Sequence, residues 1–321
     1  MIIDSYDVRT AKIDLNQNYA LSNTTIRKLR TVIVILRSGS SIGLGEATPL
    51  FKYSKETISS IKKSLSNLRL IGTEIESLDD VKEVISTKVF EENKFAKSAI
   101  ETSLFDIISR NQNVDFSYLV GSKKRSYIDL VGNIGILGES ETLLKSGKFV
   151  DEGYKTLKLK IGLDIDKEIK RVKKVIDSFP DMNIRIDANQ AYNFTQTKTL
   201  FNSLSTYGVE LIEQPMPINN LQKYKNLRVQ TSIPVMLDED MNSIQDAKRI
   251  IDHKAADKIK SKLFKTGITE TKEIVELCEK NGLDFIWGNG VQSHIGAFAE
   301  CKIEMALNKI NETCEAVGPV K

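Results

Sequence analysis

The sequence of 321 residues contains little cysteine. Its three cysteines, Cys278, Cys301 and Cys314, are odd in number and form no C-x-x-C pair. The sequence therefore supports neither a disulfide framework nor a cysteine-bound zinc ribbon. This usage is typical of a reducing compartment, and we expect a cytoplasmic protein.

An excess of charge of either sign is also missing. The sequence has 46 Lys and Arg against 43 Asp and Glu, a net charge of +3, which is too small to attract nucleic acid or an anionic membrane. Short basic runs such as residues 123–125 are typical of solvated loops. The N-terminus lacks the basic and apolar segments of a signal peptide, and no apolar run approaches the roughly 18 residues of a membrane span. We expect no nucleic-acid partner and no membrane partner.

A glycine-rich phosphate turn is the third absence, because no GxGxxG follows an early strand as a doubly wound nucleotide-binding sheet would require. From about residue 127, apolar runs instead alternate with helical patterns, such as those at residues 164–179, 193–208 and 267–282. We predict eight strands, near residues 128–134, 156–161, 184–187, 210–213, 234–238, 258–262, 285–287 and 313–317. This order favours a closed parallel barrel over an open sheet.

The first part of the chain has a different pattern. Residues 1–50 alternate between apolar and polar and contain Ser and Gly turns, which predicts a small antiparallel sheet. From residue 54 to about 111 the spacing becomes helical, and one apolar face is formed by Phe95, Ala99, Thr102, Leu104, Phe105 and Ile108. The predicted fold class is α/β, with an α+β capping domain at residues 1–122 followed by a modified TIM barrel, (β/α)7β, at residues 123–321 that carries the catalytic groups.

Five ionisable residues recur in the barrel region, namely Lys160, Asp187, Glu213, Asp238 and Lys262. By subtraction the gaps are 27, 26, 25 and 24 residues, each about one strand-plus-helix unit, so every unit brings one side chain to the same rim. Asp187, Glu213 and Asp238, which we call the carboxylate row, each end an apolar strand, where a buried carboxylate needs a cation or a hydrogen bond. A surface-facing strand end is the alternative for any one of them. Three at matching depth favour a metal site instead, and oxygen ligands in a sequence with two histidines select Mg²⁺ or Mn²⁺ over zinc.

Lysines accompany the row on two predicted strands. Lys158 and Lys160 are two residues apart, so their side chains point to the same side of the sheet. On the sixth strand Lys258, Lys260 and Lys262 share a face, and we expect that only Lys262 is close enough to the C-terminal end to reach the barrel mouth.

The strand count places the two end lysines opposite each other. Lys160 ends the second strand and Lys262 the sixth of eight, with the carboxylate row on the arc between them. A metal-bound substrate would present one face to each lysine, which suits removal of a proton from the carbon beside a carboxylate while the cation neutralises the enediolate. We expect the neighbouring cations to lower the pKa values of these lysines toward neutrality.

Five motifs lie at these strand ends: TLKLKIG, RIDANQAYN, LIEQPMP, PVMLDED and KSKLFKTG. They resemble the motifs of the enolase superfamily, specifically its muconate lactonizing enzyme subgroup, and GEATP and SAIETSLFDI resemble that family's capping domain. The resemblance implies that the carboxylate row binds Mg²⁺ and that Lys160 and Lys262 form the acid/base pair. It further implies that Lys158 tunes Lys160 and that Asn189 contacts a metal ligand. Barrels of this family commonly associate, so a homo-oligomer is compatible with the resemblance.

The eighth-strand motif departs from part of this family. Members that epimerise dipeptides carry Asp-x-Asp there to hold the substrate ammonium, whereas this sequence has CEAVGP, with Glu315 as its acidic residue. We therefore do not expect alanyl-glutamate epimerisation. Ile268 follows Gly267 where the family has a glycine pair, which changes the loop shape, and the early end of the chain predicts a smaller substrate lid.

Further candidates lie near the predicted mouth. In WGNGVQSHIG, Asn289 and Gln292 are candidate substrate contacts, and His294 is either a second base or, as we favour, a loop residue, because Lys262 already provides the second base. By resemblance the loops near residues 19–25 and 51–53 would close over the substrate. Phe51 and Tyr53 are then substrate contacts or packing aromatics.

These observations predict an isomerase. We expect a racemase or epimerase that abstracts the α-proton of a small carboxylate substrate, such as an N-substituted amino acid or a small peptide, and exchanges it between Lys160 and Lys262. The alternative is a lyase or cycloisomerase of the same subgroup, catalysing an o-succinylbenzoate synthase-like dehydration or a muconate cycloisomerisation. A non-enzymatic binding module is a third hypothesis, against which the intact five-residue series argues.

Overall fold

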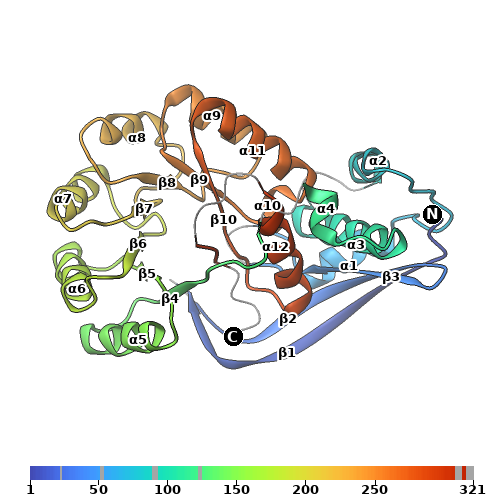
Figure 1. Cartoon of the computed structure of the whole chain (residues 1–321), viewed down its shortest axis with the longest axis horizontal. Coiled ribbons are helices and arrows are strands. Elements are labelled where there is room, and N and C mark those ends of the chain that lie inside the picture. Colours follow the sequence, from blue (N-terminus) through green and yellow to red (C-terminus); the bar gives the residue numbers. More distant parts are fainter. Residues whose placement is uncertain (22–23, 51–53, 89–92, 122–124, 308–312, 316–321) are drawn as a thin grey trace.

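The computed structural model describes residues 1–21, 24–50, 54–88, 93–121, 125–307 and 313–315. They form a three-stranded antiparallel sheet and a seven-stranded parallel sheet. In Figure 1 the first sheet runs along the lower right and helices α1–α4 lie at the right, while the second sheet curls through the centre and left with helices α5–α9 and α11 outside it. This arrangement confirms the predicted fold class of an α/β barrel preceded by an α+β cap.

The cap contains three strands and four helices. They are β1 (Ser5–Leu21), β2 (Thr24–Ser38), β3 (Ser41–Ala47), α1 (Ile58–Ser66), α2 (Leu78–Lys88), α3 (Lys94–Asn111) and α4 (Phe116–Val120). In β2 the side chains of Val32, Val34 and Leu36 are buried, as the period of two requires. The strands pair in the order β1-β2-β3, each antiparallel to the next.

Helix α3 lies against the cap sheet at close range. A Cβ atom at Gly45 would come within 1.8 Å of the carbonyl oxygen of Ala99, and one at Gly43 within 2.3 Å of that of Ser103. Glycine at both positions therefore allows the helix to contact β3 directly. All six residues of the predicted apolar face are buried, and the burial extends to almost all of residues 95–109, because the helix lies between the cap sheet and neighbouring helices.

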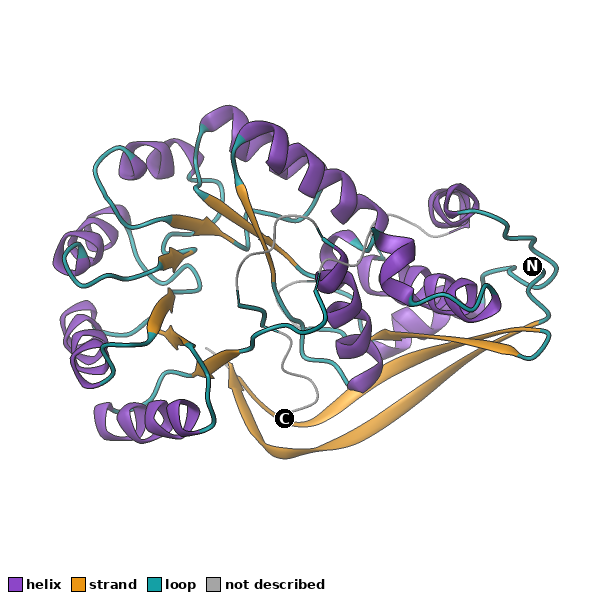
Figure 2. Ribbon diagram, in the orientation of Figure 1, coloured by secondary structure: helices purple, strands orange, loops and turns teal. Residues whose placement is uncertain are grey.

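The parallel sheet contains consecutive strands in the order β4 to β10. Its strands are β4 (Val131–Ile134), β5 (Thr156–Lys160), β6 (Asn183–Asp187), β7 (Leu211–Glu213), β8 (Val235–Leu237), β9 (Lys258–Ser261) and β10 (Asp284–Trp287). The helices are α5 (Glu139–Asp151), α6 (Ile165–Ser178), α7 (Phe194–Leu204), α8 (Leu221–Arg228), α9 (Ile244–His253), α10 (Leu263–Thr266), α11 (Thr269–Asn281) and α12 (His294–Ala306). Figure 2 shows the helices α5–α9 and α11 outside these strands.

Local sequence accounts for most helix boundaries in the barrel. The side chains of Asp164, Asn193 and Ser243 accept hydrogen bonds from the first turns of α6, α7 and α9, which is the usual role of an N-cap residue. Gly282 ends α11 in the left-handed conformation, with φ of 65°. The helices predicted at residues 164–179, 193–208 and 267–282 are therefore present with slightly shorter bounds.

The eighth predicted strand differs from the other seven. Among the described residues it contributes one parallel bridge, Leu130 to Cys314, in which the Val131 amide donates to the Cys314 carbonyl at 2.9 Å and the Cys314 amide to the Asp129 carbonyl at 2.7 Å. The prediction extended this strand to residue 317, and residues 316–317 lie outside the described ranges.

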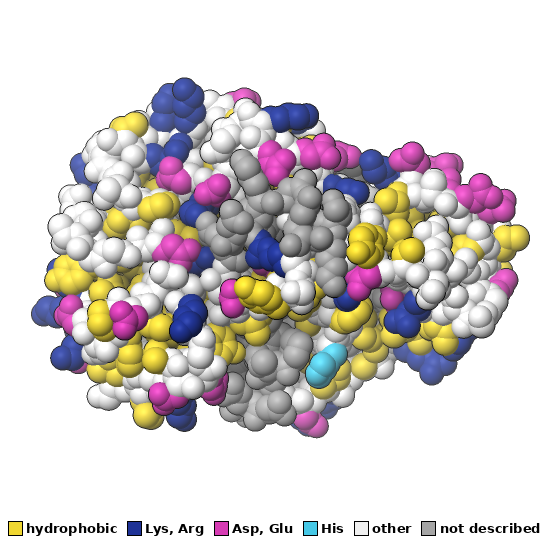
Figure 3. Space-filling view, viewed as in Figure 1, with side chains coloured by type: hydrophobic (Ala, Val, Ile, Leu, Met, Phe, Trp, Pro, Cys, Tyr) yellow, Lys and Arg dark blue, Asp and Glu magenta, His cyan; other side chains and the backbone are white. Residues whose placement is uncertain are grey.

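The surface carries both signs of charge. Figure 3 shows Lys and Arg side chains interspersed with Asp and Glu on the face viewed. None of the helices in the described ranges combines the length and the apolarity needed to span a membrane.

Candidate active site

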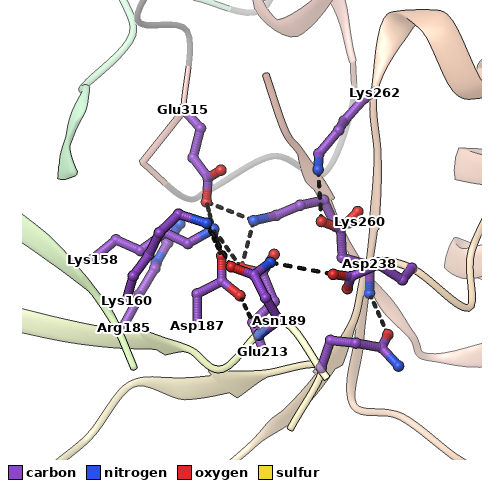
Figure 4. A network of polar contacts seen from close by, with 12 residues as sticks. Lys158, Lys160, Arg185, Asp187, Asn189, Glu213, Asp238, Lys260, Lys262 and Glu315 are labelled. Atoms are coloured by element: carbon purple, nitrogen blue, oxygen red, sulfur yellow. Dashed lines mark hydrogen bonds and ion pairs between the residues drawn. The ribbon is translucent and has the colours of Figure 1, made fainter. Parts of the chain in front are cut away.

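The carboxylate row lies at the C-terminal ends of three adjacent strands. Strand register pairs Lys160 with Asp187 and Asp187 with Glu213, and Asp238 directly follows β8. Because parallel strands end at the same edge, these residues come together as the sequence predicts. Figure 4 shows the three carboxylates between Lys158 and Lys160 on one side and Lys262 on the other.

Lysine ammonium groups neutralise the row. Lys158 Nζ lies 3.0 Å from Asp187 Oδ2, 2.7 Å from Glu213 Oε2 and 2.9 Å from Glu315 Oε1. The three carboxylates of the row are at most 1% exposed, and burying such groups without a partner would cost several kcal/mol. The ion pairs therefore explain how these carboxylates are tolerated in the interior.

One lysine stands at each end of the row. Lys160 Nζ lies 3.2 Å from Asp187 Oδ2 and donates to Asn189 Oδ1 at 2.6 Å, and the Asn189 amide donates to Asp187 Oδ1 at 3.1 Å. At the other end Lys262 Nζ donates to Asp238 Oδ2 at 2.6 Å. The structure thus brings together both predicted bases and the asparagine expected beside the first ligand.

The expectation that Lys260 does not reach the mouth is wrong. Its ammonium group lies 2.7 Å from Glu213 Oε2 and 2.6 Å from Glu315 Oε1. The long, flexible side chain extends along the barrel interior and brings the charge up to the row, although its backbone lies deeper than that of Lys262. Lys260 is 0% exposed, whereas the Lys160 side chain is 16% exposed, so Lys260 is the less accessible to a substrate.

Opposing effects set the pKa values in the row. Burial would raise the pKa of Asp187, but the ammonium groups of Lys158 and Lys160 lower it to about 2. Burial and the neighbouring Asp187 raise the pKa of Glu213 to about 7, against the attraction of Lys158 and Lys260. For Lys158, burial lowers the pKa, but three carboxylates together raise it well above its usual value. The lowering that we expected for the pKa values of Lys160 and Lys262 stays a prediction.

Unusual backbone conformations follow two of the carboxylates. Asn189 and Gln190 have φ of 42° and 68°, and Gln214, next to Glu213, has φ of 36°. Such left-handed conformations in non-glycine residues cost about 1–3 kcal/mol and concentrate at functional sites. The Gln214 side chain compensates by linking strand ends, because its Oε1 accepts from the Asp238 amide at 3.1 Å.

The sequence analysis missed Lys265, which holds the last carboxylate of the row. Its ammonium group donates to Asp238 Oδ1 and to the Asp238 carbonyl at 2.5 Å each, and to the Met241 carbonyl at 3.0 Å. Lys265 is 4% exposed. The sequence could have indicated this role, because Lys265 follows Lys262 by three residues in KLFK, a spacing that puts two side chains on the same side of a helix.

Other predicted site residues have different surroundings. Asn289 donates through Nδ2 to Glu300 on α12, and the side chain of Gln292 packs against Gly296 of the same helix, so these contacts are with a helix and not with the carboxylate row. His294 is exposed at the start of α12. Phe51 and Tyr53 lie outside the described residues.

The donor set of the row matches a hard divalent cation. Within the described ranges, no three carboxylate, imidazole or thiolate side chains are arranged to hold a metal ion directly, because ammonium groups lie among the oxygens of the row. Glu213 Oε1, however, is buried and has no hydrogen-bond partner in the part of the chain that the structure describes, so it is an acceptor that a cation would satisfy. Three carboxylates on adjacent strand ends fit Mg²⁺, whose binding here would require the ammonium groups to move aside.

Comparisons with known proteins agree with this geometry. Residues 6–121 match the family model "Mandelate racemase / muconate lactonizing enzyme, N-terminal domain", and residues 144–320 match "Enolase C-terminal domain-like". The chain is 25% identical to an N-succinyl-L-Arg/Lys racemase of Bacillus cereus, covering 100% of this chain and 88% of the relative. It is 24% identical to a chloromuconate cycloisomerase of Pseudomonas putida, covering 99% and 88%. The structure of a dipeptide epimerase from Enterococcus faecalis, complexed with Mg and the dipeptide L-Leu-L-Tyr, superposes with a TM-score of 0.91 at 26% identity, covering 99% of this chain and 91% of that one.

Proposed function

Since the chain belongs to the mandelate racemase / muconate lactonizing enzyme family of the enolase superfamily, we propose that it is a Mg²⁺-dependent racemase or epimerase of a small carboxylate substrate. The observation that carries the proposal is the pair of lysines, Lys160 and Lys262, at opposite ends of the carboxylate row. A site with one base on each side of a bound substrate is equipped to remove a proton from one face and return it to the other.

The carboxylate row would hold the cation. When bound, Mg²⁺ supplies positive charge to the substrate carboxylate and so makes the neighbouring C–H more acidic. Lys160, as the neutral amine, would accept the α-proton from one face, and Lys262, as the ammonium, would donate a proton to the opposite face. The reverse direction exchanges the two roles, so no net proton is gained or lost.

Two neighbours would keep these lysines oriented. Asn189 accepts from the Lys160 ammonium at 2.6 Å, and Asp238 accepts from that of Lys262 at the same distance. Both contacts hold the amino groups at the row, where the substrate carboxylate would bind. Positioning of this kind contributes to rate because it removes the entropic cost of bringing the groups together.

The surroundings of Glu315 favour a substrate without a free α-ammonium group. Its Oε1 already accepts from Lys158 at 2.9 Å and from Lys260 at 2.6 Å, and these two ammonium groups lower its pKa despite burial. A substrate ammonium would have to compete with both lysines for this carboxylate. We therefore propose an N-substituted amino acid as the substrate class, in line with the similarity to a racemase of N-succinyl amino acids.

Deuterium incorporation tests the proposal. The protein is incubated with Mg²⁺ in D₂O with each enantiomer of N-succinyl and N-acetyl amino acids and, for comparison, with free dipeptides. We expect α-deuterium in recovered substrate and in its epimer for the N-substituted compounds. Loss of water or ring closure without any epimer would instead assign the lyase or cycloisomerase alternative. No exchange in any compound would contradict both reactions.

A further inference from the structure

The barrel segment that carries Lys262 is bound by a carboxylate of the cap. Helix α10 begins directly after Lys262, and Gly267 and Ile268 join α10 to α11, which starts at Thr269. Glu101 on α3 accepts from the Ile268 amide through Oε2 at 2.7 Å, and through Oε1 from the Thr269 amide at 2.8 Å and its hydroxyl at 2.6 Å. Glu101 is 0% exposed, so these are buried bonds to an acidic group at the start of α11.

The packing around Glu101 leaves little space for movement. Gly267 has φ of 64°, and a Cβ atom there would lie 2.0 Å from Glu101 Oε2, so glycine allows the carboxylate to approach the turn. On the same side, the rings of Phe95 on α3 and Phe264 on α10 are stacked at 4.5 Å with an interplanar angle of 7°. The position of α10, and with it the segment after β9, therefore depends on the cap.

A second cap carboxylate supports the other neighbour of Lys262. Glu46 on β3 accepts from the Ser293 amide and hydroxyl at 2.9 and 2.6 Å, and from the Gly296 amide at 3.0 Å. These residues start α12, and the loop before them begins at Gly288, where a Cβ atom would lie 3.1 Å from Lys262 Cε. The Lys262 side chain thus packs against a loop whose far end is held by Glu46.

The cap contacts converge on one part of the barrel. The hydrogen bonds and ion pairs that join cap and barrel among the described residues end on barrel residues between 242 and 302, as in Lys94 to the Asn242 carbonyl and Lys82 to Glu273. That part contains Lys262. The described contacts of Lys160 include Asp187, Asn189 and, at its carbonyl, Arg171, all within the barrel.

We propose that Glu101 and Glu46 are positioning residues for Lys262, through which the cap holds this lysine at the carboxylate row. Glu101 acts through α10 and Glu46 through the loop that starts at Gly288. The inference rests on the proposed function in one respect, that Lys262 is one of the two bases. It goes beyond that function because it makes the geometry of one base a property of the cap and not of the barrel alone.

Chemical labelling of lysines tests the inference without a substrate. Wild-type protein and the Glu101→Gln and Glu46→Gln variants receive a short pulse of acetic anhydride, and mass spectrometry gives the acetylation of Lys262 relative to Lys160. We expect this ratio to rise roughly threefold or more in both variants, because a locally opened segment exposes its side chains more often. If the two glutamates had a purely structural role, the variants would lower global stability. Acetylation of Lys160 and of Lys262 would then increase together, and their ratio would stay unchanged.

The matched control is Lys82→Ala, which removes an exposed cap–barrel ion pair to Glu273 of 3.5 Å that does not adjoin Lys262. An unchanged ratio in both glutamine variants, or an equal rise in the control, overturns the inference. If Glu101→Gln does not fold, Glu46→Gln decides the same question through the second contact. Labelling does not depend on turnover, so the two proposals can fail separately. If the acetylation ratio rises in the variants but the wild type incorporates no α-deuterium into any substrate, the proposed function alone is rejected. If α-deuterium is incorporated but the acetylation ratio is unchanged in the variants, this inference alone is rejected.

Discussion

At the scale of single residues, the two lysines at the ends of the row have different surroundings. Lys160 is the more exposed and contacts both Asp187 and an asparagine amide oxygen, whereas Lys262 is 6% exposed and contacts Asp238. Since each lysine faces a different end of the row, each is expected to serve one face of the substrate. This asymmetry leads to a prediction for the single variants.

We predict that Lys160→Ala and Lys262→Ala each abolish racemisation but retain α-proton exchange with one enantiomer. Racemisation should fall by about a thousandfold or more, in the range for loss of a general acid or base. Proton NMR in D₂O with separate enantiomers measures exchange and racemisation together. Loss of exchange with both enantiomers in either variant would contradict the assignment of one lysine to each face.

The buried ammonium of Lys265 gives a second prediction at this scale. Lys265→Met removes its bonds to Asp238 and to the Met241 carbonyl, so Asp238 keeps its bond to Lys262 but loses the second ammonium group that orients it. We expect Mg²⁺ affinity to fall by about tenfold or more, as is usual for residues that hold a metal ligand. Calorimetric titration with Mg²⁺ measures the change. The control is Lys258→Met. Lys258 lies on the same strand face as Lys260 but is paired with Asp284, so this variant should bind Mg²⁺ as the wild type does.

At the scale of elements, α12 has an unusual polar character for a buried helix. It carries two carboxylates, Glu300 and Glu304, both 0% exposed. Burial raises the pKa of each to about 8, against the smaller lowering by neighbouring hydrogen-bond donors. The folded protein therefore favours the protonated forms of both groups near neutral pH.

These raised pKa values predict that stability decreases with pH. Between about pH 4.5 and 8 the folded state binds more protons at Glu300 and Glu304 than the unfolded state does, so the free energy of unfolding falls as pH rises through this window. The slope per group is at most about 1.4 kcal/mol per pH unit. Urea unfolding at pH 5, 6, 7 and 8 measures it. Glu304→Gln should flatten the slope, and the exposed Glu276→Gln on α11 should not. A wild-type stability that rises across this window would disagree with the assignment.

At the scale of the whole molecule, the carboxylate row connects strands that are distant in sequence. Residues from β5, β6, β7, β9 and the segment at Glu315 meet at one cluster of charges. A cation bound there in the folded state, and not in the unfolded state, would stabilise the entire barrel. The metal should therefore change the thermal stability of the protein.

We predict that Mg²⁺ raises the unfolding temperature by several degrees. A concentration a hundredfold above the dissociation constant contributes about 2.7 kcal/mol, and chelation by EDTA should reverse the shift. Scanning calorimetry of the wild type and of Asp187→Asn, Glu213→Gln and Asp238→Asn provides the measurement, with the shift expected in the wild type alone. An equal shift in all three variants would place the bound metal elsewhere.

Much of the barrel is predictable from local sequence. Within the described ranges, seven of the eight predicted strands are present, and two of the predicted helices, α6 and α7, start where Asp164 and Asn193 signal a boundary. The carboxylate row was also predictable, because one ionisable residue per strand-plus-helix unit necessarily reaches a common rim. These features depend on periodicity and on short-range capping, and both are readable within a window of a few residues.

The sequence by itself thus determined the strand order, the row and the lysines at its ends. The tertiary structure decided that Lys260 reaches the row, that Lys158 has a raised pKa, and that Glu101 binds a turn 167 residues away in the chain. Such facts depend on side-chain reach, on burial and on contacts between distant segments. They arise when the chain has folded, because the free energy of a charge depends on all the groups that surround it in space and not on its neighbours in sequence.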